Sequence, residues 1–166
     1  IIKATKEAAI GIPVSVKTRI GVNTIVTKSW IQFLLEQKLD AIIIHGRTAA
    51  ELSKAKVNWE EIGKAVRLRD EISMETVVIG NGDIISIEEA TKVSTKYKVD
   101  GIMIGKGVFT NPWVFERIPK KHTNRDYLNL LLKHTKLFCE TYPDKYRFSI
   151  LKKFFKIYVK SFYGAN

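Results

Sequence analysis

The feature that most constrains this chain is an alternation of short apolar strands and amphipathic helices between residues 14 and 115. Runs of β-branched and other apolar residues predict strands at 14–19, 41–45, 76–80 and 101–105. Helical spacing predicts helices at 4–10, 27–37 and 59–68, one that opens at 86, and one after the last strand through 115. Such an alternation is typical of an α/β fold with a parallel sheet. A doubly wound sheet and part of a (β/α)8 barrel both remain open.

Two of the predicted helices carry start signals. Asn58 stands directly before the helix at 59–68, where its side chain is suited to be the N-cap. Ser86 is followed three residues later by Glu89, which is the spacing of a capping box. These two signals predict that helices begin directly after Asn58 and Ser86.

Polar or glycine-rich residues follow each of the four predicted strands. They are Lys17 and Arg19, then His45-Gly46-Arg47, Gly80-Asn81-Gly82-Asp83 and Gly105-Lys106-Gly107. In parallel α/β folds ligands bind at the carboxyl ends of strands, and glycines there let the backbone approach an anion. No G-x-G-x-x-G motif follows the first strand, which counts against a Rossmann fold. If these are strands five to eight of a barrel, the last two clusters fall where such barrels hold a phosphate.

Each of these clusters also has a purely structural interpretation. Asn81-Gly82-Asp83 would make a tight turn before the helix, and Gly105 and Gly107 would be packing glycines. Lys17 would be a solvated strand end and His45 a core histidine with satisfied hydrogen bonds. Because the pattern recurs at four successive strand ends, a ligand site is favoured over four coincidences.

The surplus of positive charge lies at the C-terminal end. Residues 1–116 hold 16 basic and 14 acidic side chains, whereas residues 117–166 hold 12 and 3, so we place a domain boundary near 117–121. A basic, aromatic-rich tail favours nucleic acid, although a cationic solvated helical face is an equal alternative. Within 148–163, Leu151, Phe155, Tyr158 and Phe162 are predicted to pack inward, and Lys152, Lys156 and Lys160 to form an exposed stripe that contacts RNA.

The remaining composition excludes several classes of protein. No apolar run approaches the ~20 residues of a membrane span, so no membrane association is expected. The one cysteine, Cys139, excludes an internal disulfide framework and a cysteine-based zinc cluster, and fits a reducing compartment. We expect Cys139 to be buried in a helix and expect no metal site. The chain opens with Ile1-Ile2-Lys3 and no Met, and the helix at 4–10 has the pattern of the end of a longer helix, so we expect the chain to be a fragment.

Taken together, the motifs resemble those of the tRNA-dihydrouridine synthases. The resemblance is carried by VSVKTRIG at 14–21, HGRT at 45–48, IGNGDI at 79–84, MIGKG at 103–107 and NPW at 111–113. It implies a (β/α)8 TIM barrel followed by a small all-α domain, with residues 1–116 as the C-terminal half of the barrel and 117–166 as a basic tRNA-binding domain. It further implies a cytoplasmic flavoprotein that uses FMN, with NADPH as reductant, to reduce uridine to 5,6-dihydrouridine in tRNA.

The resemblance also assigns residues to roles. Lys17 would contact the flavin ring, His45 would bind the cofactor, and Arg47 would lie on the substrate side. The FMN phosphate would be held by Asn81, Gly82, Asp83, Gly105 and Lys106. Lys106 stands where the family usually has arginine, which would loosen the grip on the phosphate.

One family element is absent from this sequence. The cysteine acid of the family stands in an N-x-G-C-P segment, which does not occur here, and Cys139 lies far from any predicted strand end. We therefore expect no catalytic residue in this chain and no activity from it alone. Two alternatives stay open: an FMN barrel acting on free pyrimidines, like dihydroorotate or dihydropyrimidine dehydrogenases, and a non-catalytic RNA-binding remnant. The first of these would lack the basic tail and the HGRT motif.

Overall fold

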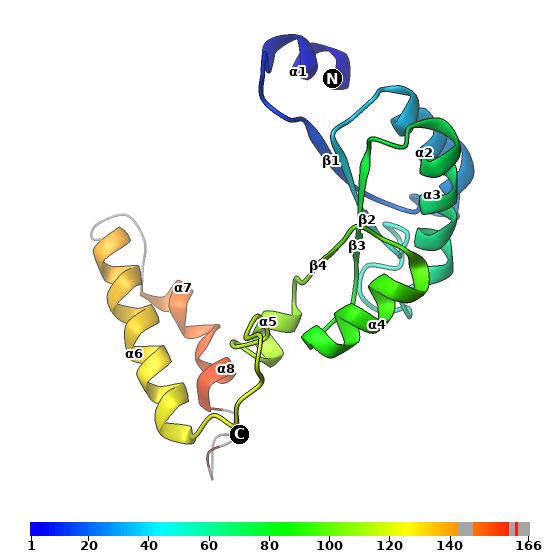
Figure 1. Ribbon diagram of the computed structural model, residues 1–166. Helices are drawn as coiled ribbons and strands as arrows, with labels where there is room; N and C mark the ends of the chain where they lie inside the picture. The colour runs from blue at the N-terminus through cyan, green and yellow to red at the C-terminus, as the bar shows by residue number, and fades with distance from the viewer. Residues whose placement is uncertain (143–147, 160–161, 163–166) are drawn as a thin grey trace. The chain divides into compact units, whose positions relative to one another are not determined.

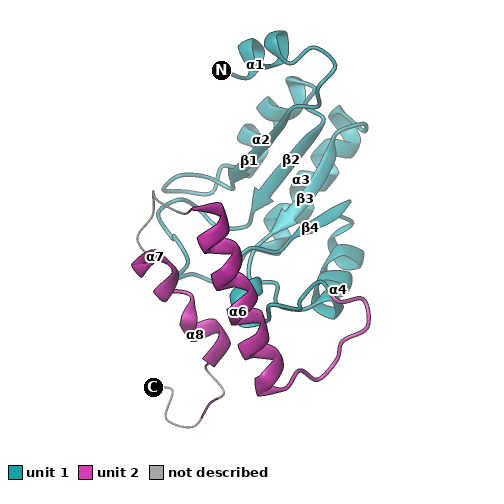
Figure 2. Ribbon diagram, turned by 90° about the vertical axis from the view of Figure 1, so that its left-hand side faces the viewer, with its two compact units in different colours: residues 1–115 teal, residues 116–166 magenta. Residues whose placement is uncertain are grey.

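The computed structural model describes residues 1–142, 148–159 and 162 of the chain. It divides the chain into two compact units, Ile1–Phe115 and Glu116–Asn166, which are coloured separately in Figure 2. The first unit contains α1 (Ile2–Ala8), β1 (Ser15–Arg19), α2 (Thr27–Glu36), β2 (Ala41–His45), α3 (Trp59–Ile72), β3 (Val77–Asn81), α4 (Ile87–Tyr97), β4 (Gly101–Met103) and α5 (Gly107–Thr110). The second contains α6 (Asn124–Thr141), α7 (Ser149–Lys152) and α8 (Phe155–Val159).

The first unit is an α/β fold with a parallel sheet, as predicted. Its strands lie in sequential order, β1-β2-β3-β4, and every neighbouring pair is parallel. Figure 1 shows α2, α3 and α4 on the same side of this sheet. A doubly wound sheet has a reversal in strand order and carries helices on both faces. The sheet of the first unit shows neither feature, so its winding differs from that of a doubly wound sheet.

The hydrophobic core lies between the sheet and those helices. Strand residues two apart, such as Ile42 and Ile44, point to this side, where they are fully buried. They pack against a stripe on α2 formed by Ile31, Leu34 and Leu35, which has helical spacing and is also fully buried. The alternate strand residues, including Lys17 and His45, therefore point to the opposite face.

Both predicted helix starts are confirmed. The Asn58 side chain accepts a hydrogen bond from the Glu61 amide at 3.2 Å, and the Ser86 hydroxyl accepts one from the Glu89 amide at 3.1 Å. The Glu89 carboxylate accepts a hydrogen bond from the Ile85 amide, at 3.0 Å, one residue before the cap. The capping box is thus completed with the neighbouring residue.

Several predictions are wrong in extent. The helix predicted at 4–10 ends at Ala8, the one predicted at 59–68 continues to Ile72, and the strand predicted at 101–105 ends at Met103. The helix after β4 ends at Thr110 instead of continuing through 115, because Pro112 keeps the preceding Asn111 extended, with φ −136° and ψ 101°. The span 148–163 is not one helix, because residues 153–154 separate α7 from α8. This break lets two adjacent rings use different partners: Phe154 packs on His134, and Phe155 on Phe148.

The second unit is built on α6, which contacts α8. A capping box of Thr123 and Asp126 starts α6, and the His134 Nδ1 atom lies 2.7 Å from the Tyr158 hydroxyl. Leu151 and Tyr158 are buried, as expected. Cys139 lies on α6, but it is exposed and not buried, because it falls outside the stripe of α6 that carries His134 and Phe138.

Candidate functional site

A pocket of about 690 Å³ lies at the carboxyl ends of the strands of the first unit. It collects the eight residues of this unit that the resemblance assigns to cofactor or substrate: Lys17, His45, Arg47, Asn81, Gly82, Asp83, Gly105 and Lys106. The remaining lining residues are Arg19, Leu52, Ser53, Ile84, Ile85, Met103, Gly107 and Thr110. Residues up to 93 positions apart in the sequence are therefore brought to one site.

Strand register explains how the sheet assembles this pocket. Arg19, His45, Asn81 and Met103 are aligned across the four strands and form one row at their carboxyl ends. Lys17 belongs to the row below, two residues earlier on β1, so its side chain points to the same face. The alternation that buries Ile42 and Ile44 in the core thus delivers the polar residues to the pocket.

His45 is held neutral by its surroundings. Burial and the nearby positive charges of Arg19, Lys17 and Arg47 lower its pKa from 6.5 to about 4, although Asp83 opposes the shift. Its Nε2 atom lies 3.5 Å from Nη1 of Arg47. A neutral imidazole offers one hydrogen-bond donor and one acceptor at pH 7 and adds no positive charge.

Arg47 is buried, with 5% of its surface exposed. Its Nε donates to the Ala55 carbonyl at 2.6 Å, and its two Nη atoms donate to the two carboxylate oxygens of Asp83 at 2.9 and 2.5 Å. Arg47, which was predicted to face the substrate, therefore uses its guanidinium to bind Ala55 and Asp83 of this chain.

Asn81 and Arg19 shape the pocket through backbone contacts. The side-chain amide of Asn81 donates a hydrogen bond from Nδ2 to the Met103 carbonyl at 2.8 Å and so joins the ends of β3 and β4. The Arg19 guanidinium donates to the carbonyls of Thr48 and Leu52, at 2.7 and 3.1 Å, and holds the loop after β2. Sequence analysis placed Arg19 at a strand end without a role, and it missed Leu52 because that loop carries no motif.

The wall formed by residues 105–107 fits an anionic group. A side chain at Gly105 would meet no atom within 4 Å, so the backbone there is open to a ligand. In the described part of the chain, the amides of Gly105 and Lys106 donate no hydrogen bond and the Lys17 and Lys106 ammonium groups have no partner. Free amides and cations around open space are what a phosphate requires.

Gly82 is needed for a different reason. Its φ of 137° is a conformation that side chains rarely adopt. A Cβ there would also lie 2.6 Å from the Val57 side chain and 3.1 Å from the His45 ring. This glycine lets the turn after β3 pack tightly beneath the pocket.

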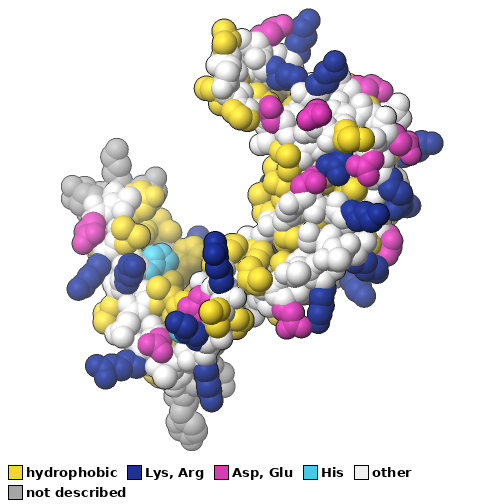
Figure 3. Space-filling model, viewed as in Figure 1, with side chains coloured by type: hydrophobic (Ala, Val, Ile, Leu, Met, Phe, Trp, Pro, Cys, Tyr) yellow, Lys and Arg dark blue, Asp and Glu magenta, His cyan; other side chains and the backbone are white. Residues whose placement is uncertain are grey.

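The lysines predicted to bind RNA belong to the second unit. Lys152 on α7 and Lys156 on α8 are exposed, but they stand on two short helices and not on one continuous stripe. Lys160 lies outside the described residues. Figure 3 shows Lys and Arg side chains interleaved with hydrophobic ones over the surface of this unit.

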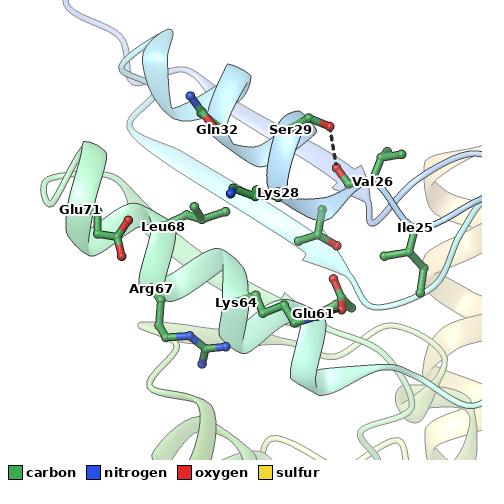
Figure 4. Close-up of a pocket in the computed structure, with 11 residues that line it drawn as sticks. Ile25, Val26, Lys28, Ser29, Gln32, Glu61, Lys64, Arg67, Leu68 and Glu71 are labelled. Carbon is green, nitrogen blue, oxygen red and sulfur yellow. Dashed lines mark hydrogen bonds and ion pairs between the residues drawn. The ribbon is translucent and has the colours of Figure 1, made fainter.

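A second groove, of about 820 Å³, lies between α2 and α3 and was not anticipated from the sequence (Figure 4). Its walls carry both signs of charge, including Lys64, Arg67 and Glu61. Burial would raise the pKa of the Glu61 carboxyl, but the hydrogen bond from Lys64 and the positive charges of Lys64 and Arg67 hold it below its ordinary value. None of the predicted site residues lines this groove.

The described residues contain no group of three or more His, Cys, Asp or Glu side chains placed to hold a metal ion. None of the helices they form is long and apolar enough to span a membrane.

The fold and the site define a parallel α/β protein with a cationic pocket at the carboxyl ends of its strands. The family model "Dihydrouridine synthase (Dus)" matches residues 1–166, and the chain belongs to this family. The resemblance inferred from the motifs is thereby confirmed.

Curated relatives agree with this assignment. The chain is 44% identical to a "Probable tRNA-dihydrouridine synthase" of Staphylococcus aureus (strain Mu50 / ATCC 700699). It is 42% identical to a "Probable tRNA-dihydrouridine synthase 2" of Bacillus subtilis (strain 168). Both comparisons cover 100% of this chain and 51% of the relative, so the chain spans about half the length of the curated relatives it matches.

Proposed function

We propose that this chain is the C-terminal part of a tRNA-dihydrouridine synthase, an enzyme that reduces uridine to 5,6-dihydrouridine in tRNA with FMN as cofactor and NADPH as reductant. The observation that carries this proposal is the gathering of all eight assigned residues of the first unit in one pocket. The names of the curated relatives support tRNA as the substrate over free pyrimidines.

The winding of the sheet supports the placement in a barrel. Four sequential parallel strands with their helices on one side are what half of a (β/α)8 barrel contributes. The opposite face of the sheet, which carries Lys17 and His45, would then face the barrel interior. The phosphate site after the last two strands of such a barrel corresponds to the turns at 81–83 and 105–107.

The residues of the pocket suit the proposed cofactor. When bound, FMN supplies hydride transfer to the uracil ring. Lys17 would stabilise negative charge beside the flavin ring, and neutral His45 would offer a directed hydrogen bond without adding charge. The amides of Gly105 and Lys106, together with the Lys106 ammonium group, would hold the phosphate.

The second unit would bind the RNA. Its exposed lysines, Lys152 and Lys156 among them, are suited to phosphate contacts, and we extend this role to Lys160. The target base is stacked in folded tRNA and has to be swung out before reduction, so the surrounding backbone must be held firmly.

No residue of this chain is proposed as the catalytic acid. Its one cysteine, Cys139, is exposed on α6 in the second unit, and the pocket of the first unit contains no cysteine. We therefore propose that the chain by itself forms no dihydrouridine.

A complementation assay tests this proposal. The chain is incubated with an unmodified tRNA transcript, FMN and NADPH, either alone or with the portion of the S. aureus relative that it does not cover. Mass spectrometry of the nucleosides should detect dihydrouridine only in the combined sample, and Lys17→Met should reduce it strongly whereas the exposed control Lys3→Met should not. Product from the chain alone, or faster reduction of free pyrimidines than of tRNA, would contradict the proposal.

A further inference from the structure

The buried guanidinium of Arg47 joins three segments around the pocket. Arg47 follows β2 directly, Ala55 belongs to the loop before α3, and Asp83 belongs to the turn after β3. The contact with Asp83 is bidentate, with one Nη atom on each carboxylate oxygen. Bidentate pairs of this kind fix geometry as well as charge.

The turn that Arg47 holds has an unusual backbone. Gly82 and Asp83 have φ values of 137° and 53°, so two successive residues adopt positive φ. Glycine and aspartate are among the residues that adopt positive φ most readily, so the sequence suits this turn. The bidentate contact from Arg47 fixes the position of the Asp83 side chain on the turn.

The pair also decides the charge of the pocket. Asp83 is the one carboxylate among the described residues that line it, and its side chain is 58% exposed. An uncompensated carboxylate would repel a phosphate bound by Gly105 and Lys106. Arg47 neutralises the negative charge of Asp83 from the protein interior, because the Arg47 side chain is buried and pairs with the Asp83 carboxylate.

We propose that Arg47 is a positioning residue for the cofactor phosphate and not an RNA contact: it neutralises Asp83 and holds the 82–83 turn in the shape that admits the phosphate. This inference rests on the proposed function, since it takes FMN as the ligand. It replaces the substrate-side role that the family resemblance gave to Arg47.

Parallel titrations with FMN and riboflavin test the inference, because riboflavin lacks only the phosphate. Flavin fluorescence is followed for the wild-type chain, Arg47→Met, Asp83→Asn and the double variant. Arg47→Met should weaken FMN binding by at least about tenfold and leave riboflavin binding within about twofold. Asp83→Asn keeps an acceptor for Arg47 and removes the negative charge, so FMN affinity should be kept or should rise.

The double variant separates charge from folding. Removing Asp83 together with Arg47 removes the uncompensated carboxylate but also the contact that holds the turn, so the double variant should bind FMN more tightly than Arg47→Met and less tightly than wild type. Arg47→Lys should give an intermediate affinity, because it supplies the charge without the bidentate geometry. Lys106→Met serves as the reference for removing a group that binds the phosphate directly.

Several results would overturn this role. Equal losses for FMN and riboflavin would make Arg47 a general structural residue, and no rescue in the double variant would exclude charge compensation. Unchanged FMN binding with weaker tRNA binding in Arg47→Met would restore the RNA contact. A wild-type chain that binds neither flavin would instead overturn the proposed function on which the inference depends.

Discussion

His45 shows how the pocket controls a single side chain. Burial and three neighbouring cations favour its neutral form, so its pKa in the folded protein lies at about 4, well below the 6.5 of an unfolded chain. Between these two values the unfolded chain binds more protons than the folded one. The free energy of unfolding therefore rises with pH across this window, and the contribution of His45 is complete above 6.5.

We predict that the His45 ring titrates with a midpoint of about 4 in the folded protein, as measured by NMR. Lys17→Met removes one of the cations that lower this pKa, so the midpoint should move upward. His45→Gln should remove the corresponding part of the pH dependence of stability between about 4 and 6.5 in urea unfolding. A wild-type midpoint near 6.5 would show that the ring is not held neutral by the pocket.

For single residues, the sequence predicted which side chains lie at the site, but not which hydrogen-bond or ion-pair partners they have. Lys17 and His45 could be found because each stands at the end of a strand with a readable apolar pattern. The ion pair of Arg47 with Asp83 spans 36 residues and depends on how two loops pack, which no local pattern encodes. The same limit hid the contact of Arg19 with the Leu52 carbonyl.

At the scale of elements, one buried arginine joins the last turn of α3 to the starts of two strands. The Arg69 Nη1 atom donates to the Thr76 carbonyl at 3.0 Å and to the Asp100 carboxylate at 2.6 Å. The same carboxylate accepts a hydrogen bond from the Val78 amide at 2.7 Å. This network lies at the amino ends of β3 and β4, opposite the pocket, where its role is to stabilise the fold.

Arg69→Met should lower the free energy of unfolding by about 2–4 kcal/mol, because it leaves Asp100 without its buried cationic partner. Urea unfolding of the chain measures this directly. Lys92→Met is the matched control, since Lys92 pairs with Glu88 on the exposed face of α4 and should leave the unfolding midpoint unchanged. An equal decrease in the free energy of unfolding in both variants would show that the Arg69 network stabilises the fold no more than an exposed ion pair does.

Helix starts were predictable and helix ends less so. Asn58 and Ser86 act locally, within three residues, and both caps formed as expected. The break between α7 and α8 was missed because Leu151, Phe155, Tyr158 and Phe162 have the spacing of one helix. That spacing also suits two short helices whose rings pack on separate partners, and only the packing of the unit decides between them.

At the scale of the molecule, the two units divide the proposed work between cofactor and RNA. The α/β class with a parallel sheet followed from the alternation of strands and helices, but the sequential strand order did not, because a doubly wound sheet has the same alternation. The helices lie on one face of the sheet because right-handed crossovers between sequential strands all pass over the same side. Which strands become neighbours depends on the packing of whole elements and not on local pattern. That one-sided winding is the strongest structural support for a barrel.

The charge of the second unit gives a prediction about RNA. Replacing Lys152, Lys156 and Lys160 with glutamine should weaken tRNA binding and flatten its salt dependence, with the log–log slope falling by up to about 0.9 for each phosphate that is no longer neutralised. Lys3, Lys54 and Lys98 of the first unit are the control, because replacing them changes the net charge equally. An unchanged slope in the first variant would contradict an RNA role for these lysines.

The central claim is that the four strand ends form a single FMN site. Titrating the isotopically labelled chain with FMN and following its backbone amides by NMR tests this claim most directly. The account predicts saturable shifts concentrated at residues 17–19, 45–47, 81–83 and 105–107, the segments that line the strand-end pocket. Shifts confined to the groove between α2 and α3, or no saturable shifts at all, would contradict it.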